Sequence, residues 1–168
     1  RDSRFQKIRD ALREEFPLQP LPAPDSITPH ACAECDGVKA VLAGRQWDTL
    51  SAQDLFLLRG ALPLLSADAL AYFWGAFVTY ALDHFDPDND VLEMVIYSLT
   101  PGTGEPSTWE HTRAQLRSIT RAQLDALLAF LKEVCEDDRF RVAYGHVQPC
   151  ASPLEEAFVI ISIALSDC

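Results

Sequence analysis

The hydrophobic pattern of the chain is densest between residues 64 and 85, where apolar side chains recur at helical spacing. They follow the i, i+3, i+4, i+7 spacing of one helix face. The opposite face is scarcely polar, since it carries mainly alanines, a glycine, a tyrosine and a threonine. A helix that is apolar nearly all round is usually enclosed by other helices. The pattern predicts a buried central helix over residues 66–85, whose uncharged run of 69–82 is too short to span a bilayer.

Start and stop signals predict further helices on both sides of this one. Ser51 with Asp54, and Thr120 with Gln123, have the spacing of capping boxes. Thr28 before Pro29 predicts an N-cap followed by proline at the first helical position. Repeated prolines predict an extended connection near the N-terminus, because each one also restricts the residue before it. The expected helices are 3–15, 28–43, one that starts after Ser51, 66–85, 89–99 with Asp88 as N-cap, 109–116 and 121–136.

The C-terminal segment gives conflicting signals. Residues 152–155 (Ser-Pro-Leu-Glu) combine an N-cap, a proline and a capping-box glutamate, whereas 158–163 (FVIISI) has the β-branched density of a buried strand. We predict a helix over 154–165, because the three-part start signal outweighs propensity. Residues 140–147 are predicted as a loop, with a short strand as the alternative.

Together these elements predict an all-α single domain, a bundle of about six or seven helices around the central one. The domain spans residues 1–168, with an N-terminal helix at 1–16, a proline-rich connection at 17–27 and a helical body at 28–168.

Charge is distributed unevenly along the chain, whose formal net charge is −11. Residues 14–110 hold 15 acids and three bases, whereas residues 1–13 hold five bases and two acids. The acidic middle would repel nucleic acid and anionic membranes and attract a basic protein partner. A solvated surface that only keeps the protein soluble is the alternative. The best local candidates for contacting a partner are Asp83, Asp86, Asp88, Asp90 and Glu93.

The cysteines suggest a second kind of site. Their odd number, five, without a repeating framework, favours a reducing compartment, so we expect a cytoplasmic protein. His30, Cys32 and Cys35 have ligand types and a short spacing that are typical of zinc, and Cys150 (or His146) could complete a tetrahedral shell. Alternatively, the two neighbouring cysteines pack as small apolar side chains on a helix face, or act as a redox pair.

Motifs for catalysis are missing from the sequence. There is no G-x-S-x-G nucleophile elbow, no phosphate-binding glycine loop and no H-E-x-x-H metal motif. We therefore expect a protein that is not an enzyme and needs no cofactor unless it binds zinc.

Three segments carry a family resemblance: I-T-P-H-A-C-A-E-C at 27–35, G-R-Q-W-D-T-L at 44–50 and L-L-S-A-D-A-L-A-Y-F at 64–73. They resemble an uncharacterised bacterial family of small acidic proteins with an H-x-C-x-E-C opening, a Trp-acid pair and an aromatic central helix. The likeness covers roughly residues 24–135. It implies a bacterial, cytoplasmic domain, and it draws attention to the His-Cys-Cys opening without assigning it a role.

Two functions follow as hypotheses. The first is an acidic, non-enzymatic protein-binding domain, an immunity-type inhibitor that covers a basic site on a partner such as a nuclease-like bacterial toxin. The alternative is a zinc protein, structural or hydrolytic, that uses His30, Cys32 and Cys35. A partner-binding module of a larger assembly is a third possibility.

Overall fold

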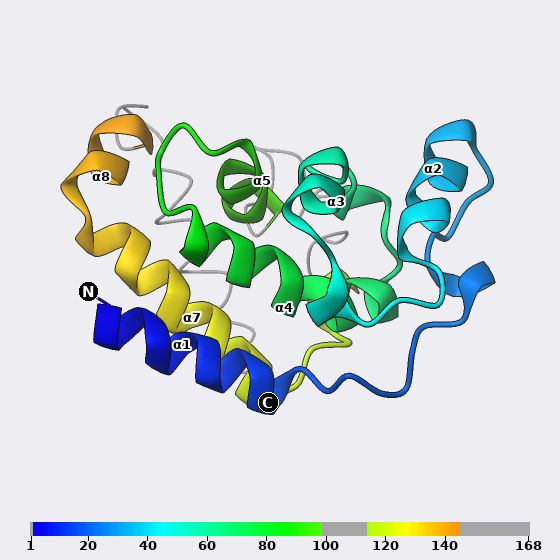
Figure 1. Cartoon of the computed structure of the whole chain (residues 1–168), viewed down its shortest axis with the longest axis horizontal. Coiled ribbons are helices and arrows are strands. Elements are labelled where there is room, and N and C mark those ends of the chain that lie inside the picture. The colour runs from blue at the N-terminus through cyan, green and yellow to red at the C-terminus, as the bar shows by residue number, and fades with distance from the viewer. Residues whose placement is uncertain (1, 99–113, 145–168) are drawn as a thin grey trace.

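The computed structural model describes residues 2–98 and 114–144, and these residues fold entirely into helices and their connections, without a strand (Figure 1). The predicted all-α class is therefore confirmed. Helical residues 114–116 precede α7. The other elements are α1 (Asp2–Glu15), η1 (Pro24–Ser26), α2 (Ala33–Leu42), η2 (Trp47–Thr49), α3 (Ala52–Leu57), η3 (Leu62–Leu64), α4 (Ala67–Asp83), α5 (Asp90–Ser98), α7 (Arg121–Glu136) and α8 (Asp138–Tyr144).

Helix α4 is the centre of the fold, as the hydrophobic pattern predicts. It contacts α1, α3, α5, α7 and η2, and most of its side chains are buried, among them those of Trp74 and Phe77. The Ser66 side chain accepts a hydrogen bond from the Ala69 N–H at 3.2 Å and so caps the first turn. The helix ends at Asp83, two residues before the predicted end.

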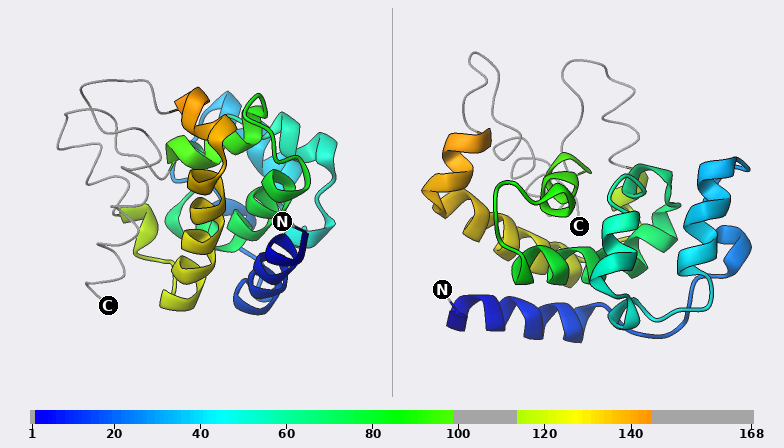
Figure 2. Two further views of the ribbon diagram at one scale, coloured as in Figure 1. Left: turned by 90° about the vertical axis from the view of Figure 1, so that its left-hand side faces the viewer. Right: turned by 45° about the horizontal axis from the view of Figure 1, so that its top comes forward.

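Helices α1 and α7 run side by side along α4 (Figure 2). The apolar stripe of α1 is buried, including Phe5, Ile8 and Leu12. At the surface, Arg4 pairs with Glu136 at 2.8 Å. The N-terminal helix is therefore an integral part of the bundle.

Both predicted capping boxes are present. The Ser51 side chain accepts from the Asp54 N–H while the Asp54 carboxylate accepts from the Ser51 N–H, and Thr120 and Gln123 repeat the arrangement. The Gln123 side-chain amide also donates to the carbonyl of Glu15 at 3.0 Å, which fastens the start of α7 to the end of α1.

Two predicted helix starts are wrong. Helix α2 begins at Ala33, and Cys32 is its N-cap residue. The predicted cap, Thr28, instead donates its hydroxyl hydrogen to the carbonyl of His30. Helix α5 is capped by Asn89, whose Oδ1 accepts from two backbone N–H groups at 2.9 and 3.3 Å, and not by Asp88.

The predicted loop over 140–147 is also wrong within the described residues, since α8 runs from Asp138 to Tyr144. The Oδ1 atom of Asp137 accepts from the Arg139 N–H at 2.9 Å, which supports this helix start. The predicted helix over 154–165 and residues 109–113 of the helix predicted at 109–116 lie outside the described residues. No helix in the described part combines the length and the hydrophobicity needed to cross a membrane.

Candidate functional site

A surface groove lies where α3, the end of α4 and the start of α5 meet. Its volume is about 420 Å³. Carboxylates, aromatic rings and one amide line it: Phe56, Tyr80, His84, Asp86, Asp88, Asn89 and Asp90. Three of the five acidic residues predicted to contact a partner, Asp86, Asp88 and Asp90, thus share one concave surface.

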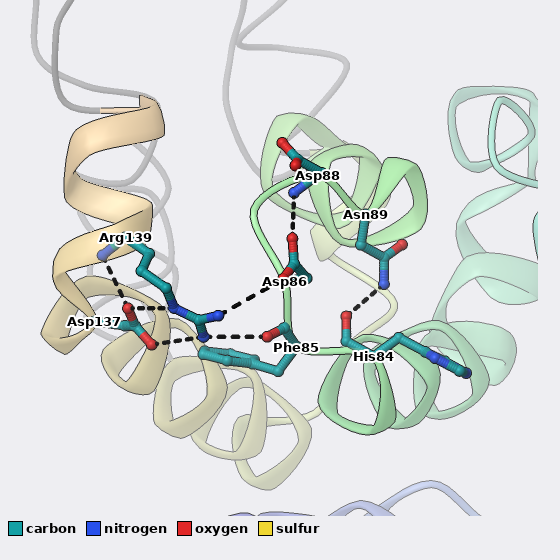
Figure 3. Close-up of polar contacts among 7 residues, drawn as sticks. All are labelled: His84, Phe85, Asp86, Asp88, Asn89, Asp137 and Arg139. Atoms are coloured by element: carbon teal, nitrogen blue, oxygen red, sulfur yellow. Dashed lines mark hydrogen bonds and ion pairs between the residues drawn. The ribbon is translucent and has the colours of Figure 1, made fainter.

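Hydrogen bonds shape the loop between α4 and α5, which contributes several of the lining residues (Figure 3). The Asn89 side-chain amide donates to the carbonyl of His84 at 2.7 Å, while its oxygen caps α5. The Asp88 N–H donates to Asp86 Oδ1 at 3.0 Å. The carboxylate of Asp86 is therefore held in place by a backbone N–H of the turn.

Arg139 on α8 contacts the same loop (Figure 3). Its Nη2 donates to the carbonyl of Phe85 at 3.3 Å, and its Nη1 lies 3.6 Å from Asp86 Oδ2. The buried carboxylate of Asp137 fixes the guanidinium through contacts of 3.0 and 3.2 Å. These hydrogen bonds to Asp137 raise the pKa of Arg139 above its ordinary value, although burial acts in the opposite direction.

The predicted acidic residues differ in how far other side chains neutralise them. Asp83 forms a hydrogen-bonded ion pair with Arg9 at 2.7 Å and does not line the groove. Asp90 lies 3.7 Å from Arg59, a distance at which an exposed pair contributes little. Within residues 2–98 and 114–144, neither Asp88 nor Glu93 has a basic side chain within ion-pair distance, but only Asp88 lines the groove.

Aromatic rings give the groove an apolar component. The rings of Tyr80 and His84 have centroids 4.3 Å apart, and the Phe56 side chain is 43% exposed. The guanidinium of Arg59 sits 4.2 Å from the Phe56 ring centroid, so this ring already receives a cation from within the chain. Converging carboxylates are nonetheless the surroundings that bind a lysine or arginine side chain through charge-assisted hydrogen bonds.

The two cysteines of the predicted metal set lie together at the start of α2. Their sulfur atoms are 2.7 Å apart, with Cys32 exposed and Cys35 fully buried. The hydrogen bond with Cys32 and then burial raise the pKa of the Cys35 thiol, whereas the Thr28 hydroxyl lowers it. Among the described residues no three His, Cys, Asp or Glu side chains converge as metal ligands, so exposed His30 does not join the pair. Cys150 and His146, the other predicted ligands, lie outside the described residues.

Sequence reasoning missed the groove residues Phe56 and Tyr80 and the residue Arg139, which supports the loop beside the groove. These three residues come from three different helices, and no sequence spacing relates them. One available signal was the apolar run of Phe56 and the two leucines after it, because a short helix can bury only part of such a run.

The fold and the groove define this protein as a small all-α protein with an acidic, aromatic surface groove. It belongs to the family of unknown function DUF6714, whose model matches residues 23–148. The match includes both the groove and the cysteine pair but not α1. The searches of curated proteins and of solved structures found no match.

Proposed function

We propose that the protein is a non-enzymatic binding protein whose groove receives a lysine or arginine side chain of a basic protein partner. The observation that carries this proposal is the convergence of Asp86, Asp88 and Asp90 on one groove beside Phe56 and Tyr80. The chain's net charge of −11 would speed encounter with a positively charged protein and restrict its choice of partner.

The kind of partner we infer is a toxin whose basic site is covered by this protein, in the manner of an immunity protein. A nuclease cleft is positively charged because it binds phosphates, and an acidic protein that enters the cleft competes with the substrate. The support for this inference is chemical complementarity, together with the lack of a catalytic motif in the sequence.

A pair of matched double variants tests the groove. Asp88→Asn with Asp90→Asn removes two groove charges, and Glu14→Gln with Asp25→Asn removes two exposed charges elsewhere. The probe is a lysine- and arginine-rich peptide, titrated by calorimetry. At up to about 1 kcal/mol for each partly exposed ion pair, loss of both groove charges lowers affinity by up to about thirtyfold. The control variant changes affinity by less than about twofold, because it alters only the long-range field.

The same variants then identify a natural partner from cell extract. A protein retained by the wild type and the control variant, but lost with the groove variant, is purified and tested for nuclease activity and for inhibition by the wild type. Equal weakening of peptide binding in the two double variants would refute the groove as the site. An association rate that does not fall as salt is raised would refute the electrostatic mechanism.

A further inference from the structure

The cysteine pair at the start of α2 has no part in the proposed binding groove. Cys32 is the N-cap residue of the helix and Cys35 lies in its first turn. Their sulfur atoms are 2.7 Å apart, about 0.7 Å more than the disulfide bond length of roughly 2.05 Å. Both cysteines are free thiols. Because the two sulfur atoms are already close, a disulfide between them needs only a small movement of the side chains.

The two thiols differ in their access to solvent. Cys32 is exposed, whereas Cys35 has no exposed surface. Helix α2 stands at one end of the molecule (Figure 1). The Cys35 N–H donates to Cys32 Sγ at 3.2 Å, which holds the exposed sulfur beside the buried one. A dissolved disulfide can therefore reach Cys32 first, and Cys35 only through it.

Simple packing does not account for this arrangement. A cysteine that serves as a small apolar side chain is buried, which describes Cys35 but not Cys32. A zinc site would need further ligands, and within residues 2–98 and 114–144 no group of three His, Cys, Asp or Glu side chains could hold a metal ion.

We propose that Cys32 and Cys35 form a thiol–disulfide exchange site, with Cys32 as the attacking thiol and Cys35 as the resolving thiol, for an accessible disulfide of the form RS–SR. In the first step the Cys32 sulfur, having released its proton, attacks one sulfur of RS–SR. A mixed disulfide forms, the RS–SR bond breaks, and RS⁻ leaves and takes up a proton.

In the second step Cys35 attacks Cys32 Sγ. The bond between the two protein sulfurs forms, the bond from Cys32 to SR breaks, and the second RS⁻ takes up the proton that Cys35 loses. The protein dithiol is oxidised by two electrons, and one RS–SR is reduced to two RSH.

The test exposes the reduced full chain to glutathione disulfide and follows the thiols by intact-mass and peptide mass spectrometry after alkylation. In the wild type we expect loss of two hydrogen atoms and a Cys32–Cys35 disulfide. Cys35→Ala should instead accumulate one glutathionyl group on Cys32. Cys32→Ala should react at Cys35 slower by on the order of tenfold or more, because that thiol is buried.

Peptide mapping separates this reaction from any at Cys135, Cys150 and Cys168, and circular dichroism confirms that each variant is folded. Cys35→Ser replaces Cys35→Ala if the latter unfolds. The wild-type result needs no variant, so it stands as a test by itself.

Three results would overturn the proposal. One is a glutathionyl group that stays on Cys32 of the wild type without being resolved. Another is equal reactivity of Cys32 and Cys35 in the two single variants. The third is stoichiometric zinc in protein purified without added metal, protecting both thiols and lost in Cys32→Ser, which would identify a metal site instead.

Discussion

Gly75 on α4 faces the indole ring of Trp47, and a methyl group added at this position would press against the ring. A Cβ atom built on Gly75 lies 3.1 Å from Cδ2, 3.1 Å from Cε2 and 3.2 Å from Cζ2 of Trp47. The ring is only 4% exposed, and its N–H donates to the carbonyl of Phe16 at 2.8 Å. Because that hydrogen bond and the surrounding core fix the ring, it has little freedom to retreat.

Two opposing effects set the magnitude for Gly75→Ala. Replacing glycine by alanine inside a helix contributes about 1 kcal/mol of stability. Forcing an extra methyl group into a packed core costs about 1–3 kcal/mol. We therefore expect a net loss of about 1 kcal/mol in the free energy of unfolding. Gly37→Ala in α2 is the matched control, because its added Cβ meets nothing within 4 Å, so it should gain up to about 1 kcal/mol.

Urea unfolding followed by circular dichroism measures both variants against the wild type. The two should differ by about 2 kcal/mol, with midpoints on opposite sides of the wild-type value. Combining Gly75→Ala with Trp47→Leu should reveal a favourable coupling energy, since the leucine removes the ring that the methyl group presses against. If Gly75→Ala were as stabilising as Gly37→Ala, the idea of an immobile Trp47 ring would be refuted.

Two further predictions concern charged groups. Hydrogen bonds from the side chain and the backbone of Ser51 lower the pKa of Asp54 in the folded protein. The ionised carboxylate of Asp54 therefore stabilises the fold fully above its unfolded-state pKa of about 3.9. This stabilisation is lost as the pH falls through the lower pKa of the folded state. Urea midpoints should show Asp54→Asn less stable than the wild type near neutral pH, with the difference vanishing in acid. Arg139→Ala removes side-chain donors from the buried carboxylate of Asp137 and should lower the midpoint of thermal unfolding. Lys7→Ala, at an exposed position of α1, should leave the midpoint nearly unchanged, and equal shifts in the two variants would contradict this reasoning.

The parts of the fold that sequence predicts well are those decided by neighbouring residues. The capping boxes at Ser51 and Thr120 join side chains and backbone groups three residues apart, so their spacing alone identifies them. The central helix is equally predictable from the sequence, because a helix that is apolar on all sides is stable only when other helices bury it.

Predictions of helix starts failed where a competing contact within the same turn decided the outcome. Thr28 has the residue type and position of an N-cap, yet its hydroxyl binds the carbonyl of His30 and the helix starts after Cys32. Asp88 and Asn89 are both good caps, and the choice of Asn89 follows from its second bond to His84 across the turn. Residue type and position alone do not rank such alternatives, because the deciding contact depends on the conformation that the turn adopts.

The acidic groove was only half predictable for a related reason. The cluster of carboxylates after α4 is visible as a run of acids, whereas the rings of Phe56 and Tyr80 reach the groove from two other points in the chain. The hydrogen bond from Arg139 to the carbonyl of Phe85 depends on α8, a segment that was not predicted as a helix from the sequence.

Charge along the chain is also a poor guide to charge in space. The basic N-terminal segment looks separate from the acidic middle in the sequence, but α1 places Arg9 on Asp83 and Arg4 between Glu133 and Glu136. Part of the acidic surface is thereby neutralised from within. A partner would meet negative charge chiefly where α1 does not reach. Among the predicted acids that line the groove, Asp88 alone has no cation in ion-pair distance within residues 2–98 and 114–144. For this reason the groove, and not the overall charge of −11, is the feature that gives the proposed interaction a definite site.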